Sequence, residues 1–260
     1  MFGVRRKNSG GDVVFITSFY DCCLAVRDAA LRLLFPPVCA VCGAAIPNED
    51  EFLLCKNCLN EVRPVPPPVC SICGKPLGAS FANGHRCGEC ILKPPVYERC
   101  ISLFAFDGPV RELLHKIKYR DDGYALRAMS RLARAYLPAN LSIELVIPVP
   151  LHSKRLRERG YNQCVNLAKF IFNDIPISYD GLKRRIYTQP QTSLERKQRL
   201  VNLKGAFNAC LSQDFAKKRI LLLDDVLTTG ATVNECVLTL WKAGFRNITV
   251  LTVARAVKDF

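Results

Sequence analysis

Short apolar runs alternate with stretches of helical periodicity in the C-terminal two thirds of the chain. Largely apolar runs occur at residues 99–106, 145–149, 220–223 and 248–254. A strand without alternating polar residues is covered on both faces, as in a parallel sheet. Helical periodicity between these runs predicts helices over Val110–Tyr119, from Tyr161 to near Asn173, and from Thr232 up to Gly244. The pattern predicts an α/β domain with a mainly parallel sheet and flanking helices.

The apolar run 220–223 ends in polar chemistry. Asp224 and Asp225 follow it directly, at the sheet edge where ligands of open α/β folds usually lie. A hydroxyl-rich turn comes next, made of Thr228, Thr229, Gly230, Ala231 and Thr232. Thr232 and Glu235 have the spacing of a capping box, so the next helix is expected to begin there. Its apolar stripe comprises Val233, Cys236, Val237, Leu240 and Trp241.

Such a turn at a helix N-terminus suits a phosphate, and the paired carboxylates suit ribose hydroxyls or a metal ion. Two other interpretations fit the acids alone: an ordinary strand end, or the metal-binding strand of a nucleotide hydrolase. The chain contains no G-x-x-x-x-G-K-[ST] motif to cradle a nucleoside triphosphate. The motif therefore favours a sugar phosphate.

A basic run follows the strand predicted at 145–149. It contains Lys154, Arg155, Arg157 and Arg159, and it ends at Gly160 before Asn162 and Gln163 open a helix. A solvated helix face is the simple alternative, but arginines behind a second buried strand can grip a pyrophosphate. Farther on, the polar and basic stretch from Lys183 to Phe207 by itself predicts a mobile surface segment, and long loops of this kind beside a site often serve as lids.

Eight of the fourteen cysteines form four C-x-x-C pairs near the N-terminus. The pairs are Cys39 and Cys42, Cys55 and Cys58, Cys70 and Cys73, and Cys87 and Cys90. Two such pairs complete a tetrahedral zinc site, so two structural zinc ions are expected. Sequential pairing of the C-x-x-C pairs is favoured over a cross-braced arrangement. The lack of an export signal predicts a location in the reducing cytoplasm, where disulfides are disfavoured. The remaining cysteines, among them Cys164 and Cys236, are expected to be buried thiols.

The N-terminal segment and the net charge indicate how the chain is divided and which partners it favours. Val13–Phe35 is interrupted by charges, so it predicts an amphipathic helix and no membrane span. Three parts are expected: a basic tail and helix at 1–37, a double zinc ribbon at 38–95 and an α/β domain at 96–260. The formal net charge of +14 favours polyanionic partners, and eight zinc-bound thiolates would reduce it to about +10.

Taken together, these motifs resemble the ComF (ComFC-type) competence family. The resemblance covers an N-terminal F-P-P, the double zinc ribbon, P-V-P-L-H-x-x-R-L-R-x-R-G-Y-N-Q, then T-x-x-Q with a later R-x-x-N, and D-D-V-L-T-T-G-A-T. It implies a type I phosphoribosyltransferase-like fold that binds phosphoribosyl pyrophosphate (PRPP) with Mg²⁺.

The resemblance also implies roles for individual residues. Asp224 and Asp225 would hold the ribose hydroxyls, and residues Thr228 to Thr232 would wrap the 5′-phosphate. The segment with Arg155, Arg159, Gly160, Asn162 and Gln163 would face the pyrophosphate. A hood over the ligand would contain Thr188, Gln191, Arg199 and Asn202. No residue is implied as a catalytic base.

Two functions remain open from the sequence. The first is a phosphoribosyltransferase that transfers phosphoribosyl to an unknown acceptor and releases pyrophosphate, in a role linked to DNA uptake and natural transformation. The second is a non-catalytic competence factor that senses PRPP or binds single-stranded DNA. The resemblance implies single-stranded DNA and a competence helicase as partners in either case.

Overall fold

A computed structural model describes residues 36–47, 51–82, 84–186 and 203–256. The helix predicted at Val13–Phe35 lies outside these residues. The same holds for the hood residues Thr188, Gln191, Arg199 and Asn202.

A parallel sheet of four strands forms the centre of the C-terminal part. The strands are β1 (Arg99–Ala105), β2 (Leu145–Pro148), β5 (Ile220–Leu227) and β6 (Ile248–Arg255), arranged in the order β1-β6-β5-β2. All three strand pairs are parallel, and nearly every residue of β5 is buried. The predicted α/β class with its mainly parallel sheet is therefore confirmed.

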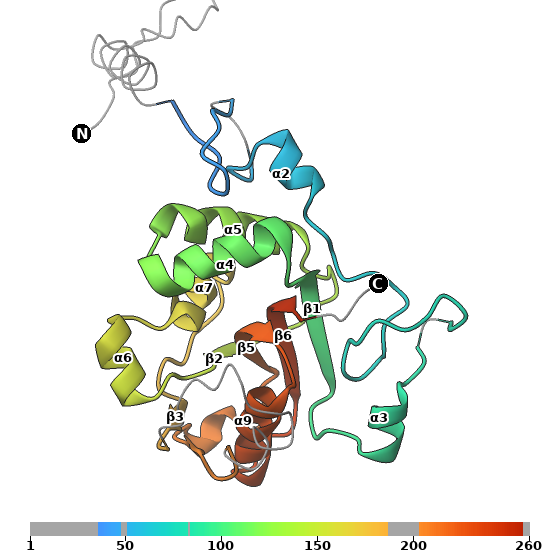
Figure 1. The fold of residues 1–260 in the computed structure, drawn as a ribbon. Helices are drawn as coiled ribbons and strands as arrows, with labels where there is room; N and C mark the ends of the chain where they lie inside the picture. Colours follow the sequence, from blue (N-terminus) through green and yellow to red (C-terminus); the bar gives the residue numbers. More distant parts are fainter. Residues whose placement is uncertain (1–35, 48–50, 83, 187–202, 257–260) are drawn as a thin grey trace, which may run out of the picture.

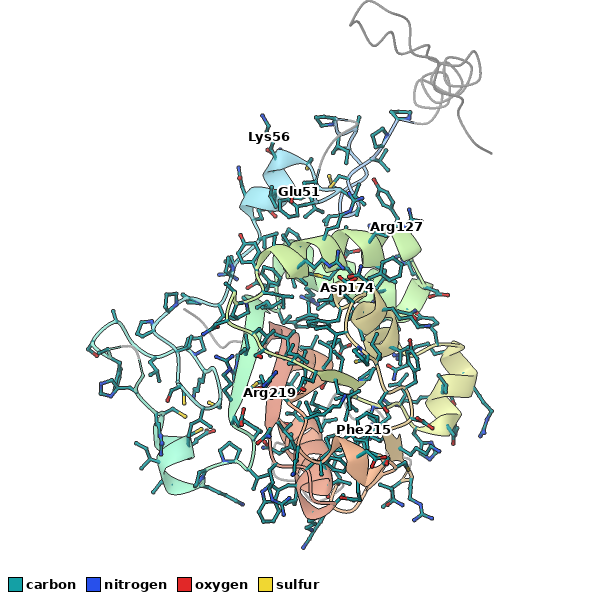
Figure 2. All side chains as sticks on the ribbon, turned by 180° about the vertical axis from the view of Figure 1, so that it is seen from behind. Glu51, Lys56, Arg127, Asp174, Phe215 and Arg219 are labelled. Atoms are coloured by element: carbon teal, nitrogen blue, oxygen red, sulfur yellow. The ribbon has the colours of Figure 1, made fainter. Side chains whose placement is uncertain are left out.

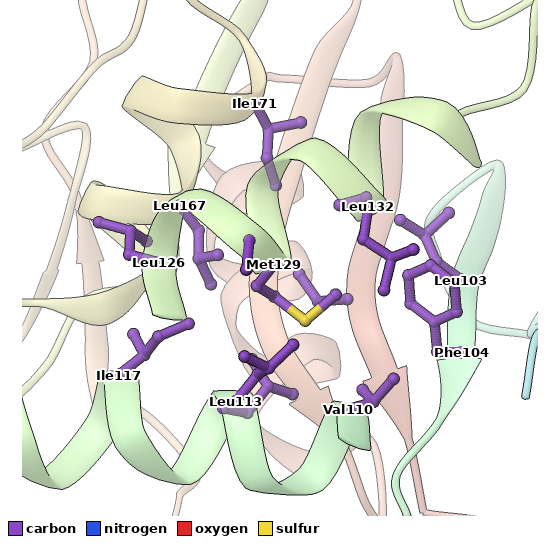
Figure 3. Packing of buried hydrophobic residues seen from close by; sticks show 14 of the residues in the cluster. Leu103, Phe104, Val110, Leu113, Ile117, Leu126, Met129, Leu132, Leu167 and Ile171 are labelled. Atoms are coloured by element: carbon purple, nitrogen blue, oxygen red, sulfur yellow. The ribbon is translucent and has the colours of Figure 1, made fainter. Parts of the chain in front are cut away.

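Three helices cover one face of the sheet. They are α4 (Gly108–Arg120), α5 (Gly123–Ala135) and α7 (Gln163–Ile171). Figure 3 shows how Leu113, Met129 and Leu167, one from each helix, meet in a single apolar layer. This layer also contains Leu221 and Leu223 of β5, so alternate residues of that strand face these helices.

The other face of the sheet is covered by α9 (Ala231–Lys242) and a small antiparallel pair of strands (Figure 1). The pair consists of β3 (Leu182–Arg184) and β4 (Phe207–Ala209), and a 3₁₀ turn, η1 (Gln213–Phe215), follows it. A short helix, α6 (Ser153–Arg159), connects β2 to α7. The Lys183–Phe207 stretch thus begins and ends in strands that pack against the body.

Two cysteine-rich loops precede the sheet. Each contains one short helix, α2 (Lys56–Asn60) in the first ribbon and α3 (Gly88–Leu92) in the second. Figure 1 shows the first ribbon over the α4 and α5 layer and the second beside the edge strand β1. The loops repeat each other locally, because a bridge joins Val38 to Ala45 in one and Val69 to Pro76 in the other.

The boundaries at the acid pair differ from the prediction. Strand β5 continues past Leu223 through both acids to Leu227, because β6 pairs with it along this length. Its other neighbour, β2, ends at Pro148, opposite Leu223. At the acids, β5 therefore pairs with β6 on one side and has no β2 residue beside it on the other.

The predicted capping box is wrong. Helix α9 begins at Ala231, and its N-cap is Gly230, which has a φ of 76° and makes no side-chain cap. The Glu235 side chain instead accepts a hydrogen bond from the Gly205 N–H at 2.6 Å.

Trp241 departs from the predicted apolar stripe: it is 39% exposed, and the Arg246 guanidinium lies 4.3 Å from its ring centre.

Candidate functional site

The acid pair lies near the N-terminus of α7. Asp224 and Asp225 are each 8% exposed, and each accepts a hydrogen bond from the backbone N–H that follows it. Asp225 Oδ2 also accepts from the Gln163 amide at 3.2 Å. The Cys164 sulfur donates to Asp224 Oδ1 at 3.5 Å, and one ligand atom from each of the three residues lies within 4.8 Å of the others.

Burial changes the acidity of this group. Burial, together with the neighbouring Asp225 carboxyl, raises the pKa of Asp224 to about 8. Burial and then the two carboxylates raise the pKa of the Cys164 thiol. Asp224 therefore holds a proton at neutral pH until a positively charged or hydrogen-bond-donating ligand favours its ionised form. Buried acids with raised pKa values are typical of functional sites.

The hydroxyl-rich turn from Thr228 to Thr232 connects β5 to α9. Among the described residues, only the Ala231 N–H of this turn has an acceptor, the Thr229 hydroxyl at 3.4 Å. No acceptor within the described part of the chain uses the other four N–H groups of the turn, so these can bind a ligand. An anion held there would also benefit from the positive end of the twelve-residue helix α9.

The turn between α6 and α7 connects the basic run to the acids. Arg159 Nη1 donates to Gln163 Oε1 at 2.9 Å, while Gln163 Nε2 donates to Asp225. This chain of hydrogen bonds runs from a cation to a carboxylate and fixes the orientation of the Gln163 amide. Gly160 makes the sharp turn possible, because its φ is 82°.

Asn162 and Tyr161 use their side chains to hold this turn in place. Asn162 caps α7 by accepting from the Cys164 N–H at 3.0 Å, and its amide nitrogen donates to the Val149 carbonyl at 3.0 Å. The Tyr161 hydroxyl donates to the Ile117 carbonyl at 2.6 Å and accepts from the Asp121 N–H. Both residues therefore position the turn relative to β2 and α4.

Two residues near the acids were missed by sequence reasoning. Arg184 of β3 is largely enclosed, and burial, followed by the charge of Arg155, lowers the pKa of its guanidinium. Asp224 also acts on Arg184 electrostatically, so the cation belongs to the surroundings of the acid pair. Cys164 was expected only as a buried thiol, although its position next to Gln163 was the available signal. Arg184 was hidden within a basic stretch whose fold the local pattern did not predict.

The eight cysteines gather in two groups, each formed by consecutive pairs. In each group the four sulfur atoms lie within 4.8 Å of one another. Cys42 Sγ lies 3.7 Å from Cys55 Sγ, and Cys73 Sγ lies 3.7 Å from Cys87 Sγ. A tetrahedral zinc ion with Zn–S bonds of about 2.3 Å separates its sulfurs by about 3.8 Å, whereas a disulfide needs about 2.05 Å. The donor sets therefore fit two structural zinc ions, in sequential pairing.

Local backbone contacts prepare the sulfurs for metal. The Cys87 N–H donates to Cys70 Sγ at 3.2 Å. Burial raises the pKa of Cys70, but backbone hydrogen bonds from Cys73, Cys87 and Ile72 outweigh it and lower the pKa to about 6. The same balance lowers the pKa of Cys39 to about 6. One thiolate in each group is thus available to start metal binding near neutral pH.

Comparison with known proteins places both parts of the chain. A family model described as "Double zinc ribbon domain" matches residues 30–91. "Competence protein F" of Haemophilus influenzae is 33% identical over 214 residues, which cover 78% of this chain and 90% of the relative. The chain belongs to the competence protein F (ComF) family.

Another relative agrees with this family. "DNA utilization protein YhgH" of Salmonella typhi is 31% identical over 179 residues, covering 66% of this chain and 78% of the relative. Among solved structures, a Bacillus subtilis glutamine PRPP amidotransferase is 17% identical and covers 49% of this chain and 25% of its own, with a TM-score of 0.32. The ComF chain thus combines a double zinc ribbon with an α/β domain built on a parallel sheet. Within the described residues, none of its helices has the length and apolar character needed to cross a bilayer.

Proposed function

We propose that this ComF protein binds PRPP and transfers its phosphoribosyl group to an acceptor, with release of pyrophosphate. The observation that carries this proposal is the position of the acid pair beside a turn whose backbone N–H groups, except that of Ala231, have no acceptor among the described residues. Asp224 and Asp225 lie in β5, and the turn begins three residues after Asp225. A ribose with a 5′-phosphate presents hydroxyls and an anion in one small molecule, which matches this combination of acids and N–H groups.

Each part of the sugar phosphate has a matching group. The N–H groups between Thr228 and Thr232, at the start of α9, would bind the 5′-phosphate. Asp224 and Asp225 would accept hydrogen bonds from the ribose 2′- and 3′-hydroxyls. These hydrogen bonds favour ionised carboxylates, so binding would draw the Asp224 proton into solution.

Cations near the acids suit the leaving group. Arg155 and Arg159 come from α6, and Arg184 comes from β3. In the transfer, the acceptor forms a bond to C1 of the ribose while the bond from C1 to the pyrophosphate oxygen breaks, and its electron pair leaves with pyrophosphate. The acceptor's proton passes to solvent. The three arginines would bind the leaving group, and Asp225 would stabilise positive charge on the ribose ring.

Mg²⁺ that accompanies PRPP would supply further charge neutralisation on the pyrophosphate oxygens. The hood residues Thr188, Gln191, Arg199 and Asn202 remain predictions, and their proposed role is to cover the bound pyrophosphate.

The names of the relatives refer to competence and to DNA utilisation. We propose that this activity serves the handling of incoming DNA in the cytoplasm, together with the helicase that the family resemblance implies.

Calorimetry with PRPP and Mg²⁺ tests the binding step. We expect binding by the wild-type protein and a loss of at least about 100-fold in the Asp224→Ala/Asp225→Ala variant, since two charge-assisted contacts disappear. Asp180→Ala, at an exposed acid outside the site, serves as the control and should bind like wild type. Equal affinity of the double variant and the control would refute the proposed site.

A pyrophosphate-release screen over nucleobases and amines tests the transfer step. Release that depends on an acceptor and disappears in the double variant would establish an enzyme. PRPP binding with no release in any reaction would instead favour a PRPP sensor.

Single-stranded DNA binding is the second candidate, favoured by the surroundings of Tyr119. This side chain is 61% exposed, with Lys118 Nζ and the Arg159 guanidinium 5.7 and 5.6 Å from its ring centre. Exposed aromatics among cations are typical of stacking platforms for single strands.

Fluorescence anisotropy with a labelled oligothymidine tests this second candidate. We expect steep salt dependence and a weakening of about 10-fold in Tyr119→Ala, the loss typical of one stacked base. Tyr179→Ala is a matched control, because Tyr179 is 55% exposed and has Lys169 Nζ 5.2 Å from its ring centre. Equal weakening by both substitutions would remove Tyr119 as a specific platform.

A further inference from the structure

The second zinc ribbon is joined directly to the edge of the sheet. The Cys100 N–H of β1 donates to the Ile72 carbonyl at 2.6 Å, inside the first C-x-x-C turn of that ribbon. Gly74 follows this turn with a φ of +64°, and a Cβ atom there would lie 2.4 Å from the Cys100 carbonyl oxygen. The cysteine turn is therefore packed so closely on β1 that only glycine fits.

A second contact connects the same cysteine turn to β6. Arg255 Nη1 donates to the Cys73 carbonyl at 2.7 Å, and Arg255 is the last residue of β6. This arginine is half-buried, which limits solvent competition for the hydrogen bond. The charged donor makes the bond stronger than one between neutral groups.

Arg255 also lies next to the start of the phosphate turn. In the parallel ladder it is the register partner of Leu227, the last residue before Thr228, and the Ala256 N–H donates to the Leu227 carbonyl at 2.9 Å. On its other side, the Phe106 N–H donates to the Arg255 carbonyl at 2.7 Å. Arg255 thus connects the zinc-binding turn to Leu227: its guanidinium binds the turn, and its backbone pairs with Leu227 in the sheet.

The first ribbon contacts the protein elsewhere. Lys116 Nζ of α4 donates to the carbonyls of Ala40 and Val41 at 2.8 and 2.9 Å, and Arg131 of α5 donates to the Glu51 carbonyl. Figure 2 shows Glu51 and Lys56 of this ribbon at the same end of the molecule as Arg127 of α5. Its cation-to-carbonyl contacts therefore support the helical layer and not the end of β6.

We propose that the second zinc site, acting through Arg255, positions the phosphate turn. Zinc holds the Cys70–Gly74 turn in shape, this turn fixes Arg255, and Arg255 fixes the end of β6 against Leu227. Arg255 is a positioning residue in this scheme, since it touches neither the proposed phosphate nor the ribose. The PRPP part of the scheme rests on the proposed function, but the coupling between ribbon and turn does not.

Matched substitutions in the two ribbons test the coupling. Arg255→Met and Gly74→Ala each disturb the contact between the second ribbon and the sheet. Lys116→Met and Gly43→Ala are the equivalent changes in the first ribbon, where Gly43 has a φ of +77° and open space around its missing Cβ. Zinc content by mass spectrometry confirms that both metals remain bound in every variant that is compared.

Amide hydrogen exchange of the full-length protein without ligand is the deciding measurement. We expect exchange at the hydrogen-bonded N–H groups around the turn, those of Phe106, Val226, Ala231 and Ala256, to become about 5- to 20-fold faster in Arg255→Met and Gly74→Ala, a typical coupling between two sites, and to change little in the two controls. Arg255→Lys should restore part of the protection, because lysine can still donate to the Cys73 carbonyl. Equal exchange at these residues in all four variants would overturn the proposal.

PRPP affinity is the second measurement. If the wild-type protein binds PRPP, we expect a weakening of similar size in the second-ribbon variants and none in the controls. Faster exchange with unchanged affinity would overturn the positioning role in ligand binding. Absence of PRPP binding by wild type would refute the proposed function, and the exchange result would then decide the coupling alone.

Discussion

Asp224 shows how much one residue depends on its surroundings. The carboxyl lies within β5, after four apolar residues and beside Asp225, so both burial and a like charge oppose its ionisation. In the unfolded chain the same group ionises near its ordinary pKa of about 3.9. Between about pH 4 and pH 8, the folded protein therefore holds a proton that the unfolded chain has lost, and its stability decreases as pH rises.

Asp224→Asn should remove this pH dependence. Comparing urea unfolding at pH 6 and pH 8, we expect the variant to gain stability relative to wild type by up to about 3 kcal/mol, because each pH unit contributes at most slightly more than about 1 kcal/mol. An asparagine oxygen can still accept from the Asp225 N–H, so the local contact is preserved. Asp180→Asn is the control for a general effect of charge. Parallel pH profiles of wild type and Asp224→Asn would contradict the raised pKa.

Local residue patterns did not reveal side-chain partners that are distant along the chain. The spacing of Thr232 and Glu235 fitted a capping box, yet Glu235 accepts from Gly205, thirty residues away in the chain. Gln163 was predicted at the pyrophosphate side, and the structure joins it to Asp225. The first contact could not be expected from a local motif, because it depends on how β4 and α9 pack.

At the level of elements, the junction of β5 and α9 depends on the backbone of Gly230. This residue combines a φ of 76° with the N-cap position of α9. A Cβ atom here would make only ordinary contacts, with Asn234 Nδ2 at 3.7 Å and Leu227 Cδ1 at 3.9 Å. The cost of a side chain therefore comes from the left-handed conformation and not from a collision.

Gly230→Ala should reduce the free energy of unfolding by about 1–2 kcal/mol. It should also weaken PRPP binding, because the strained turn holds its N–H groups less well for the phosphate. Gly244→Ala, at the other end of α9 with a φ of +101°, should destabilise similarly without affecting PRPP binding. Denaturant unfolding and calorimetry on both variants measure the two effects. Equal PRPP affinity in Gly230→Ala and wild type would argue against the turn as the phosphate site.

The sheet elements were predictable because their signal is continuous. The runs at 145–149, 220–223 and 248–254 all became strands of the parallel sheet. Helix α5 was not predicted, although Asp122 caps it by accepting from the N–H groups of Tyr124 and Ala125. Strands β3 and β4 were also missed, since each has three residues and depends on its partner for stability.

At the scale of the whole molecule, two metal sites hold segments that have little apolar core of their own. The second ribbon's buried cluster consists of Cys70, Cys87 and Cys90, with few apolar neighbours. Metal binding must therefore provide much of the folding free energy of this ribbon.

Double substitutions test the sequential pairing of the zinc ligands. Cys42→Ser/Cys55→Ser should retain about one zinc ion per chain, because both residues belong to the first site. Cys42→Ser/Cys73→Ser should retain almost none, since it damages both sites. Metal content after gel filtration measures this, and circular dichroism shows whether the α/β domain remains folded. The opposite order of zinc retention would indicate a cross-braced arrangement.

The sequence by itself determined the features whose residues are close together along the chain. These are the C-x-x-C pairs, the buried strands, and the acids followed by a hydroxyl-rich turn. Their chemistry depends on spacings of a few residues, which the backbone geometry makes predictable. Only the tertiary structure decided which distant groups surround the acids and which ribbon contacts β6. Those contacts arise from strand order and helix packing, so Arg184, Cys164 and Arg255 acquire their partners only when the whole chain is folded.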